Sequence, residues 1–176
     1  MINTVATADQ LLNQAMLLLA AEPNAVFLGQ NVLYDGNVMF KHFEGVPYAQ
    51  RLELPVVEEF QMGLSIGLAL QGFLPISIYP RCDFLLLAMN QLVNHLDKLP
   101  LMTKGAFRPK VIIRTKVGSK YPLNAGPQHT HDHTAAFRLM LTTVNVARIE
   151  TASQIMPTYQ KAINSPVSTL IIEALG

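Results

Sequence analysis

The chain has 176 residues, a formal net charge of +1, 50% hydrophobic residues and only 14% charged ones. This length is sufficient for one domain with its own core, and so few charges indicate that a partner covers part of the surface. No basic stripe and no alternation of basic and aromatic residues is present, which argues against nucleic-acid binding. The single cysteine, Cys82, excludes a disulfide framework and a thiolate metal cluster, and it fits a reducing compartment.

No segment of the sequence has the pattern of an export signal or of a membrane span. The N-terminal Met1-Ile-Asn-Thr lacks the basic-then-apolar order of a signal peptide. The apolar run from Met62 to Tyr79 is interrupted by Gln71, Gly72 and Pro75, so it does not form a continuous spanning helix. We therefore expect a soluble, cytoplasmic protein.

Helical and strand patterns alternate along the chain. In order, the predicted elements are helix 7–21, strand Ala25–Gly29, loop 30–50, strand Arg51–Leu54, helix 58–71, strand Leu74–Tyr79, helix 84–98, strand Val111–Arg114, loop 115–133, helix Thr134–Leu141, strand Val144–Ile149, helix 151–164 and strand Val167–Glu173. Apolar strands between helices predict an α/β fold, a three-layer αβα arrangement with a mainly parallel sheet covered on both faces. With no internal repeat or linker, we expect one domain over residues 1–176 and no second domain in this chain.

The most informative segment runs from Leu54 to Gly72. It places Glu58 after Pro55, at the predicted start of an apolar helix that contains small residues. A helix N-terminus favours negative charge, and small residues allow another backbone to approach closely. Taken alone, Glu58 reads more simply as a solvated first-turn acid beside Glu59.

Several motifs in the same order resemble a known family. They are Pro55, Glu58, Gly63, Gly67, Ala69 and Gly72; Pro75-Ile and Asp83-Phe84; Ala88-Met-Asn-Gln-Leu-Val-Asn94 and Lys98; and Gly126-Pro-Gln-His129-Thr. Nearly the whole chain is similar to the pyrimidine-binding domain of thiamine diphosphate enzymes, and most similar to the beta subunit of 2-oxo acid dehydrogenases. Transketolase and deoxyxylulose-phosphate synthase share this domain. The resemblance implies a subunit that takes part in 2-oxo acid decarboxylation or in two-carbon transfer.

The resemblance also implies roles for three residues. The family's glutamate hydrogen-bonds a ring nitrogen of the cofactor's aminopyrimidine and promotes the tautomer that deprotonates the thiazolium carbon; Glu58 matches it. Phe84 matches the aromatic residue that stacks on the aminopyrimidine, although an aromatic residue at a helix start more often packs in a core. His129 matches a histidine near the reacting carbon, where it would contact substrate or transfer a proton.

Two departures from the family pattern bear on this interpretation. The magnesium motif of the diphosphate-binding half, Gly-Asp-Gly followed by Asn-Asn, is absent from the sequence. The resemblance therefore implies a separate diphosphate-binding subunit that holds the cofactor's diphosphate and Mg²⁺. We expect a homodimer or a heterotetramer with this partner, with helix 58–71 as the contact surface. In addition, Phe60 replaces a glycine and Ile78 replaces an acid, which leaves a non-catalytic dimerisation or regulatory module as an alternative.

The sequence assigns no definite role to several other polar residues. His129, His131 and His133 alternate around Asp132, and a metal-dependent lyase or hydrolase built on them is a weaker alternative. Gly126 and Pro127 favour a loop there rather than a strand, and no known ligand spacing is completed, so we assign no metal ligands. Arg114, Lys116 and Lys120 either contact an anionic substrate or face water, and the second reading is the simpler one. We further expect Cys82 to be a small buried residue, and Tyr34, Asp35 and Asn37 to form part of a wall of the site.

Overall fold

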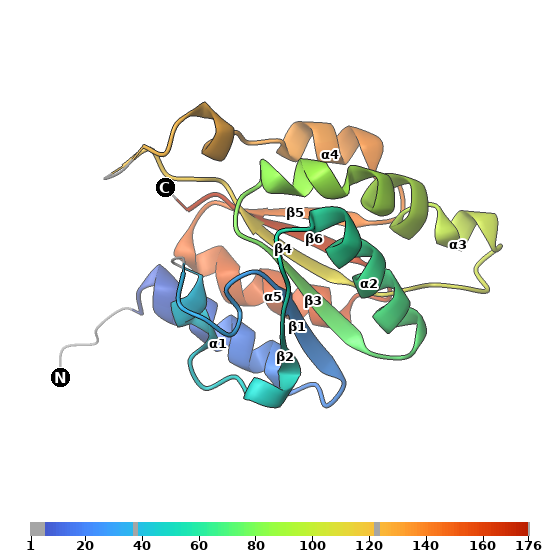
Figure 1. Cartoon of the computed structure of the whole chain (residues 1–176), viewed down its shortest axis with the longest axis horizontal. Coiled ribbons are helices and arrows are strands. Elements are labelled where there is room, and N and C mark those ends of the chain that lie inside the picture. The colour runs from blue at the N-terminus through green and yellow to red at the C-terminus, as the bar shows by residue number, and fades with distance from the viewer. Residues whose placement is uncertain (1–5, 37–38, 122–123, 176) are drawn as a thin grey trace.

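A computed structural model describes residues 6–36, 39–121 and 124–175. Its centre is a six-stranded sheet in the order β2-β1-β3-β4-β6-β5, and every pair of neighbouring strands is parallel (Figure 1). The strands are β1 (Ala25–Gly29), β2 (Arg51–Glu53), β3 (Leu74–Tyr79), β4 (Ile112–Lys116), β5 (Asn145–Ile149) and β6 (Thr169–Glu173).

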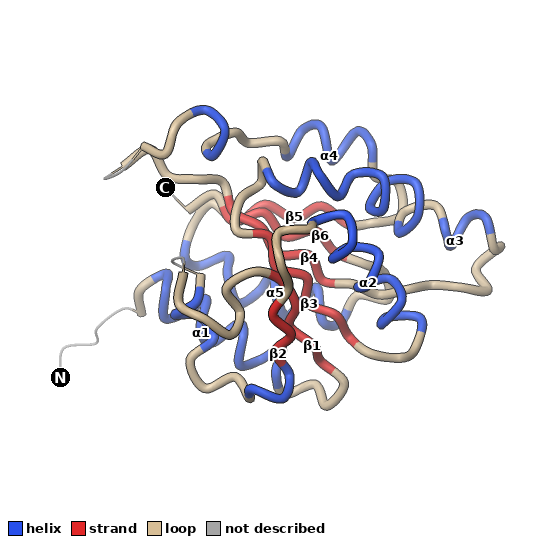
Figure 2. Tube along the Cα trace, viewed as in Figure 1, coloured by secondary structure: helices blue, strands red, loops and turns tan. Residues whose placement is uncertain are grey.

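Helices cover both faces of this sheet. They are α1 (Ala8–Ala20), α2 (Glu58–Leu70), α3 (Leu99–Met102), α4 (Thr134–Met140) and α5 (Ile155–Asn164). Helices α1 and α5 lie on one face, and α2, α4 and the helical segment after β3 lie on the other (Figure 2). The predicted three-layer α/β class is confirmed. Within the described residues, no helix is both long and apolar enough to cross a bilayer.

The predicted elements are present, with differences at their ends and in one helix. The segment predicted as helix 84–98 consists of a 3-10 helix, Phe84–Ala88, and a π-helix, Asn90–Leu96. Within the predicted loops, short 3-10 helices occur at Phe40–Phe43, Tyr48–Gln50 and Pro127–His129. The side chain of Thr7 caps α1, and a capping box at Thr151 opens a 3-10 helix, Ala152–Gln154, that continues into α5.

Two clusters of buried apolar residues, one on each face, hold the layers together. The first joins α1 and α5 to the sheet through residues such as Met16, Phe27 and Tyr159. The second joins α2, α4 and the segment after β3 through residues such as Met62 and Phe137. Burial of such side chains contributes about 1.5–3 kcal/mol each, so both faces are needed for stability.

The order of strands creates a switch point between β1 and β3. The connection after β1 packs on the α1 face through Val32, Met39 and Phe43, whereas the connection after β3 packs on the α2 face through Leu85 and Leu92. In open parallel sheets, ligands bind in the crevice beyond the carboxyl ends of the strands at such a point. The fold thus predicts that a ligand would bind in the region beyond Gly29 and Tyr79.

Arg114 is completely buried, and the expectation that it faces water is wrong. It lies in the middle of β4, where its Nε and Nη2 atoms donate to Glu173 at 2.7 and 3.1 Å. Tyr159 donates to the same carboxylate at 2.6 Å, and His42 Nδ1 lies 2.8 Å from Arg114 Nη2. Burial and the Arg114 charge lower the pKa of His42 to about 4. A buried charge must be paired in this way, because the interior does not replace its hydration.

Asp97 fixes the turn that leads into β5. Its carboxylate is buried and accepts hydrogen bonds from the backbone N–H groups of Thr142, Thr143 and Val144 at 2.8, 2.7 and 3.1 Å. Burial alone would raise the pKa of Asp97, but these bonds and the one from Lys98 hold it below its usual range. One side chain therefore connects the end of the π-helical segment to the start of β5.

Asp97→Ala should lower the free energy of unfolding by about 2 kcal/mol, because three backbone donors lose their acceptor. Urea titration followed by circular dichroism measures the change. Lys98→Ala is the matched control and should cost less than about 1 kcal/mol, because Lys98 forms a partly exposed ion pair. Equal losses in the two variants would show that the backbone bonds to Asp97 do not carry the effect.

Candidate functional site

Glu58 is the first residue of α2, and its side chain faces the sheet rather than solvent. It is 5% exposed, in contrast to the neighbouring Glu59, which is exposed. The buried positions of α2 include Met62 and Ile66, which follow Glu58 at intervals of one helical turn. The interpretation of Glu58 as a solvated acid is therefore wrong for this chain, and its carboxylate reaches the switch point between β1 and β3.

The Glu58 carboxylate has little hydrogen bonding of its own. Within the described residues, it accepts one bond, from Gln30 Nε2 at 3.3 Å, beyond the end of β1. Tyr79 at the end of β3 donates its hydroxyl to the Glu58 backbone oxygen, also at 3.3 Å. A buried carboxyl group with spare hydrogen-bonding capacity can share a proton with a ligand. The geometry therefore leaves Glu58 free to contact a polar group brought from outside.

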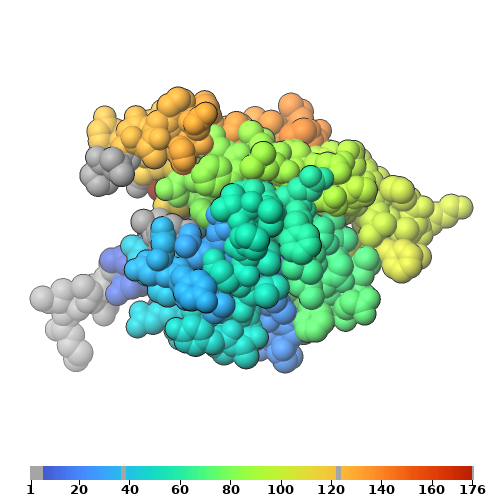
Figure 3. Space-filling model, in the orientation of Figure 1, coloured from blue at the N-terminus to red at the C-terminus, as the bar shows by residue number. Residues whose placement is uncertain are grey.

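An open groove of about 680 Å³ begins at Glu58 and runs along α2. It is lined by Val57, Glu58, Glu59, Phe60, Gly63, Leu64, Leu87 and Gln91. Figure 3 shows this face, where α2 lies beside the helical segment after β3. Phe60 and Leu87 are 58% and 63% exposed, so Phe60 lies on the surface of the groove and fills no enclosed pocket of this chain.

Phe84 and His129 come together although 45 residues separate them in the sequence. Their ring centroids are 5.4 Å apart in an edge-to-face arrangement, and Phe84 is half-buried. Gly118, just beyond β4, lets the backbone of His129 pack close to it, because a Cβ there would lie 1.8 Å from the backbone oxygen of His129. Nδ1 of His129 is buried without a hydrogen-bond partner in the described structure. The two residues thus form one unit at the carboxyl ends of β3 and β4.

The other two histidines of the loop meet a carboxylate that the sequence pattern did not indicate. His131 and His133 both contact Asp83, whereas Asp132 binds Arg148 and Thr134 instead. As predicted, this stretch is a loop and not a strand. The association with Asp83 was missed because 48 residues separate it from His131.

Further predicted residues have simple positions. Tyr34, Asp35 and Lys120 are exposed, Lys116 is half-buried, and Asn37 lies outside the described residues. Cys82 is buried and free, as expected, and burial raises the pKa of its thiol to about 11.

Gln61 has a role that sequence reasoning missed. Its Nε2 donates to Ser77 Oγ at 3.1 Å and to the Ile78 oxygen at 2.9 Å, and these bonds hold α2 against β3.

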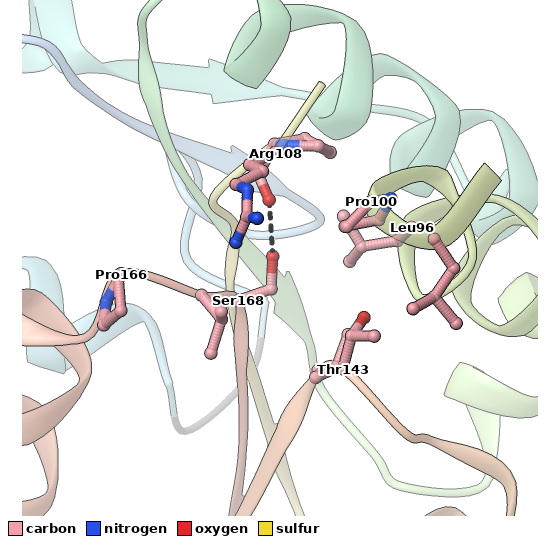
Figure 4. A pocket seen from close by; sticks show the side chains of 10 residues that line it. Leu96, Pro100, Arg108, Thr143, Pro166 and Ser168 are labelled. Atoms are coloured by element: carbon pink, nitrogen blue, oxygen red, sulfur yellow. Dashed lines mark hydrogen bonds between the residues drawn. The ribbon is translucent and has the colours of Figure 1, made fainter. Parts of the chain in front are cut away.

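A second cavity of about 230 Å³ lies at the opposite end of the sheet. Its lining includes Leu96, Thr143 and Val167, near the amino ends of β5 and β6, and it is mostly apolar (Figure 4). Ser168 at its edge donates to the Pro109 oxygen at 3.0 Å, the bond drawn in Figure 4. None of the predicted site residues lines this cavity, so the groove beside Glu58 is the better candidate site.

No family model matches the chain, but individual proteins of known family do. The beta subunit of 3-methyl-2-oxobutanoate dehydrogenase from Mycobacterium tuberculosis is 29% identical over 146 residues, which cover 77% of this chain and 41% of that protein. The pyruvate dehydrogenase E1 component subunit beta of Gracilaria tenuistipitata var. liui is 34% identical over 87 residues, which cover 49% and 26%. The resemblance to 2-oxo acid dehydrogenase beta subunits is confirmed. The chain spans less than half the length of these beta subunits.

Solved transketolase structures share the fold. A split gene transketolase, described as an inactive beta4 tetramer, superimposes with a TM-score of 0.73 over 96% of this chain and 52% of that one, at 17% identity. Transketolase from Leishmania mexicana gives a TM-score of 0.69 over 93% of this chain and 24% of that one, at 16% identity. The chain therefore shares the fold of these transketolase structures, while its sequence is similar to the dehydrogenase beta subunits.

Proposed function

We propose that this chain is the pyrimidine-binding subunit of a split thiamine diphosphate enzyme, completed by a separate subunit that binds the diphosphate and Mg²⁺. The observation that carries the proposal is the buried Glu58 carboxylate at the mouth of an apolar groove. The similarity to dehydrogenase beta subunits in sequence and to transketolases in fold supports it. The reaction would be 2-oxo acid decarboxylation or two-carbon ketol transfer.

The residues present fit the pyrimidine end of this cofactor. Glu58 offers a carboxyl group with unused hydrogen-bonding capacity, and the groove beside it is lined mainly by apolar side chains. Phe84 offers a half-buried aromatic ring at the carboxyl end of β3. When bound, thiamine diphosphate supplies a carbon nucleophile and an electron sink, so the protein is left with orientation and proton transfer.

Each residue then has a defined task. Glu58 would hold or share a proton at a ring nitrogen of the aminopyrimidine, and a water-poor surrounding would strengthen that interaction. Phe84 would pack against the ring and set its orientation. His129, held by Phe84 and by the close approach at Gly118, presents its imidazole as a substrate contact or proton donor. Gln30 and Tyr79 fix the start of α2, and with it Glu58.

We propose that the partner subunit binds the exposed apolar surface beside Glu58. Val56, Val57, Phe60, Leu86 and Leu87 are all exposed, between 41% and 71%. Gly67 has no atom within 4 Å of the position of a Cβ, so this side of α2 is open to close approach by another backbone. A second chain on this surface would cover the groove and exclude water from Glu58. Phe60, where the family has glycine, then contacts the partner.

The proposal predicts cofactor binding only when both subunits are present. The full chain should be co-expressed with the product of the neighbouring gene, and thiamine diphosphate with Mg²⁺ titrated into the purified complex by calorimetry. We expect one binding site for each chain of this type in the complex and none in either subunit alone. Activity should be assayed with 2-oxo acids and a redox dye, and with ketose donors and aldose acceptors.

Two results would contradict the proposal. A neighbouring subunit without Gly-Asp-Gly and Asn-Asn would remove the expected diphosphate half of the site. A stable complex that binds no thiamine diphosphate would favour the alternative, a dimerisation or regulatory module that keeps the fold. Phe60→Gly in that complex tests the cause, because restored binding would show that the Phe60 ring blocks the cofactor.

A further inference from the structure

A second cluster of polar side chains lies beside the predicted cofactor residues and is used by none of the steps above. It consists of Asp83, from the start of the connection after β3, and of His131 and His133, from the loop before α4. One ligand atom from each residue lies within 4.8 Å of the other two. These are the side chains that most often bind zinc and related metals.

We infer that Asp83, His131 and His133 form a binding site for a divalent transition-metal ion of the zinc type. The separations fit the geometry of such a site. Asp83 Oδ1 lies 3.1 Å from His131 Nδ1 and 3.3 Å from His133 Nε2. In a tetrahedral site with metal–ligand distances of about 2.0–2.1 Å, ligand atoms are about 3.3 Å apart. Two of the three distances between ligand atoms are therefore close to the value expected for a tetrahedral site.

Asp83 gives independent support for a ligand at this position. Its side chain is only 9% exposed, and its Oδ2 atom is buried without a hydrogen-bond partner in the described structure. A buried carboxylate oxygen of this kind normally has a partner, because leaving it unpaired costs about 1–3 kcal/mol. A metal ion held by Asp83 would neutralise this carboxylate and make use of both histidine rings.

Both histidine rings contact the same oxygen atom, Asp83 Oδ1. The His131 and His133 centroids are 5.6 Å apart with an interplanar angle of 37°, and His133 also packs edge-to-face on the buried Phe137 at 6.4 Å. Phe137 thereby holds one ligand in place, while His131 remains 59% exposed and leaves the site open to solvent. Three protein ligands and an open position are typical of an exchangeable or reactive metal site rather than a closed structural one.

This site is separate from the Mg²⁺ assigned to the partner subunit. Mg²⁺ prefers six oxygen ligands, whereas two imidazoles and one carboxylate suit zinc, iron(II) or cobalt(II). The loop 126–133 carries His129 together with two of the ligands, and Asp83 directly precedes Phe84. Metal binding would therefore fix both segments that carry the predicted cofactor and substrate contacts.

The test uses the full chain without a histidine tag, stripped with a chelator and titrated with Zn²⁺ by calorimetry. We expect about one equivalent of bound zinc and a rise in melting temperature with Zn²⁺. Asp83→Asn and His131→Ala should each weaken the affinity by at least about 10-fold. Cobalt(II) substitution should give visible absorption bands in the wild-type protein that are absent in both variants.

Two control variants show whether any binding is specific to this cluster. Asp132→Asn removes a carboxylate from the same loop that contacts Arg148 instead, and His95→Ala removes an exposed histidine on the π-helical segment. Both should keep the wild-type affinity. The inference is overturned if the stripped protein binds less than about a tenth of an equivalent at 100-micromolar Zn²⁺, or if the controls weaken binding as much as Asp83→Asn does. Melting curves without metal confirm that each variant is folded.

Discussion

Glu58→Gln should lower the turnover of the reconstituted complex by about 10²- to 10⁴-fold, the usual contribution of one positioned acid–base group. The change removes one ionisable proton and keeps the size of the side chain. The glutamine can still receive the hydrogen bond from Gln30, so α2 should begin at the same place. Steady-state kinetics with the best 2-oxo acid or ketose substrate measures the effect, and calorimetry measures cofactor affinity separately.

Glu59→Gln is the matched control for this experiment. Glu59 occupies the next position of α2, is exposed, and lies 3.4 Å from Asn90 rather than near Gln30. The Glu59→Gln variant should keep its activity within about threefold of the wild-type protein, since a substitution at an exposed position seldom has a large effect on the fold. Turnover that is unaffected by Glu58→Gln would remove Glu58 from the proposed chemistry. If Glu58→Gln lowers the melting temperature so far that unfolding accounts for the loss of activity, Glu58 has a structural role instead.

The sequence was sufficient to predict the architecture because local signals agreed with one another. Apolar runs such as Leu74–Tyr79 became fully buried strands, and the helices predicted to begin at Thr7 and Thr151 are capped by these two residues. The burial of Glu58 was also available from the sequence, because Met62 and Ile66 follow it at helical spacing. That signal was weak, since a first-turn carboxylate is equally favoured in water.

Contacts between distant segments could not be predicted. Arg114 is the last residue of the predicted strand 111–114, and its charge suggests a surface position. Only the pairing of β4 with β6 brings Glu173, 59 positions later in the sequence, into contact with it. Likewise, nothing in the loop 115–133 indicates that Asp83 lies beside His131. Local periodicity determines which face a residue occupies, but pairing between charges depends on strand order, and strand order is not encoded in local periodicity.

Arg114→Met should destabilise the protein by about 3–5 kcal/mol, because it leaves Glu173 buried without its counter-ion. Urea unfolding at pH 7 measures this loss. Arg148→Met is the matched control: Arg148 also pairs with an acid, Asp132 at 3.0 Å, but both side chains are about 30% exposed, so less than about 1 kcal/mol is expected. Similar losses of unfolding free energy in both variants would mean that burial of the Arg114–Glu173 pair does not determine the size of the effect.

The pH dependence of the Arg114→Met effect distinguishes a lost ion pair from lost packing. Burial alone would raise the pKa of Glu173, but Arg114, Tyr159 and His42 together lower it. In the wild-type protein, the stability that comes from Glu173 is therefore present above its unfolded pKa of about 4.3 and is lost as pH falls through the lower folded value. Without Arg114, burial raises the folded pKa, so protonation at low pH stabilises the variant. The difference in unfolding free energy should thus shrink between pH 7 and pH 4, whereas a packing defect would leave it constant.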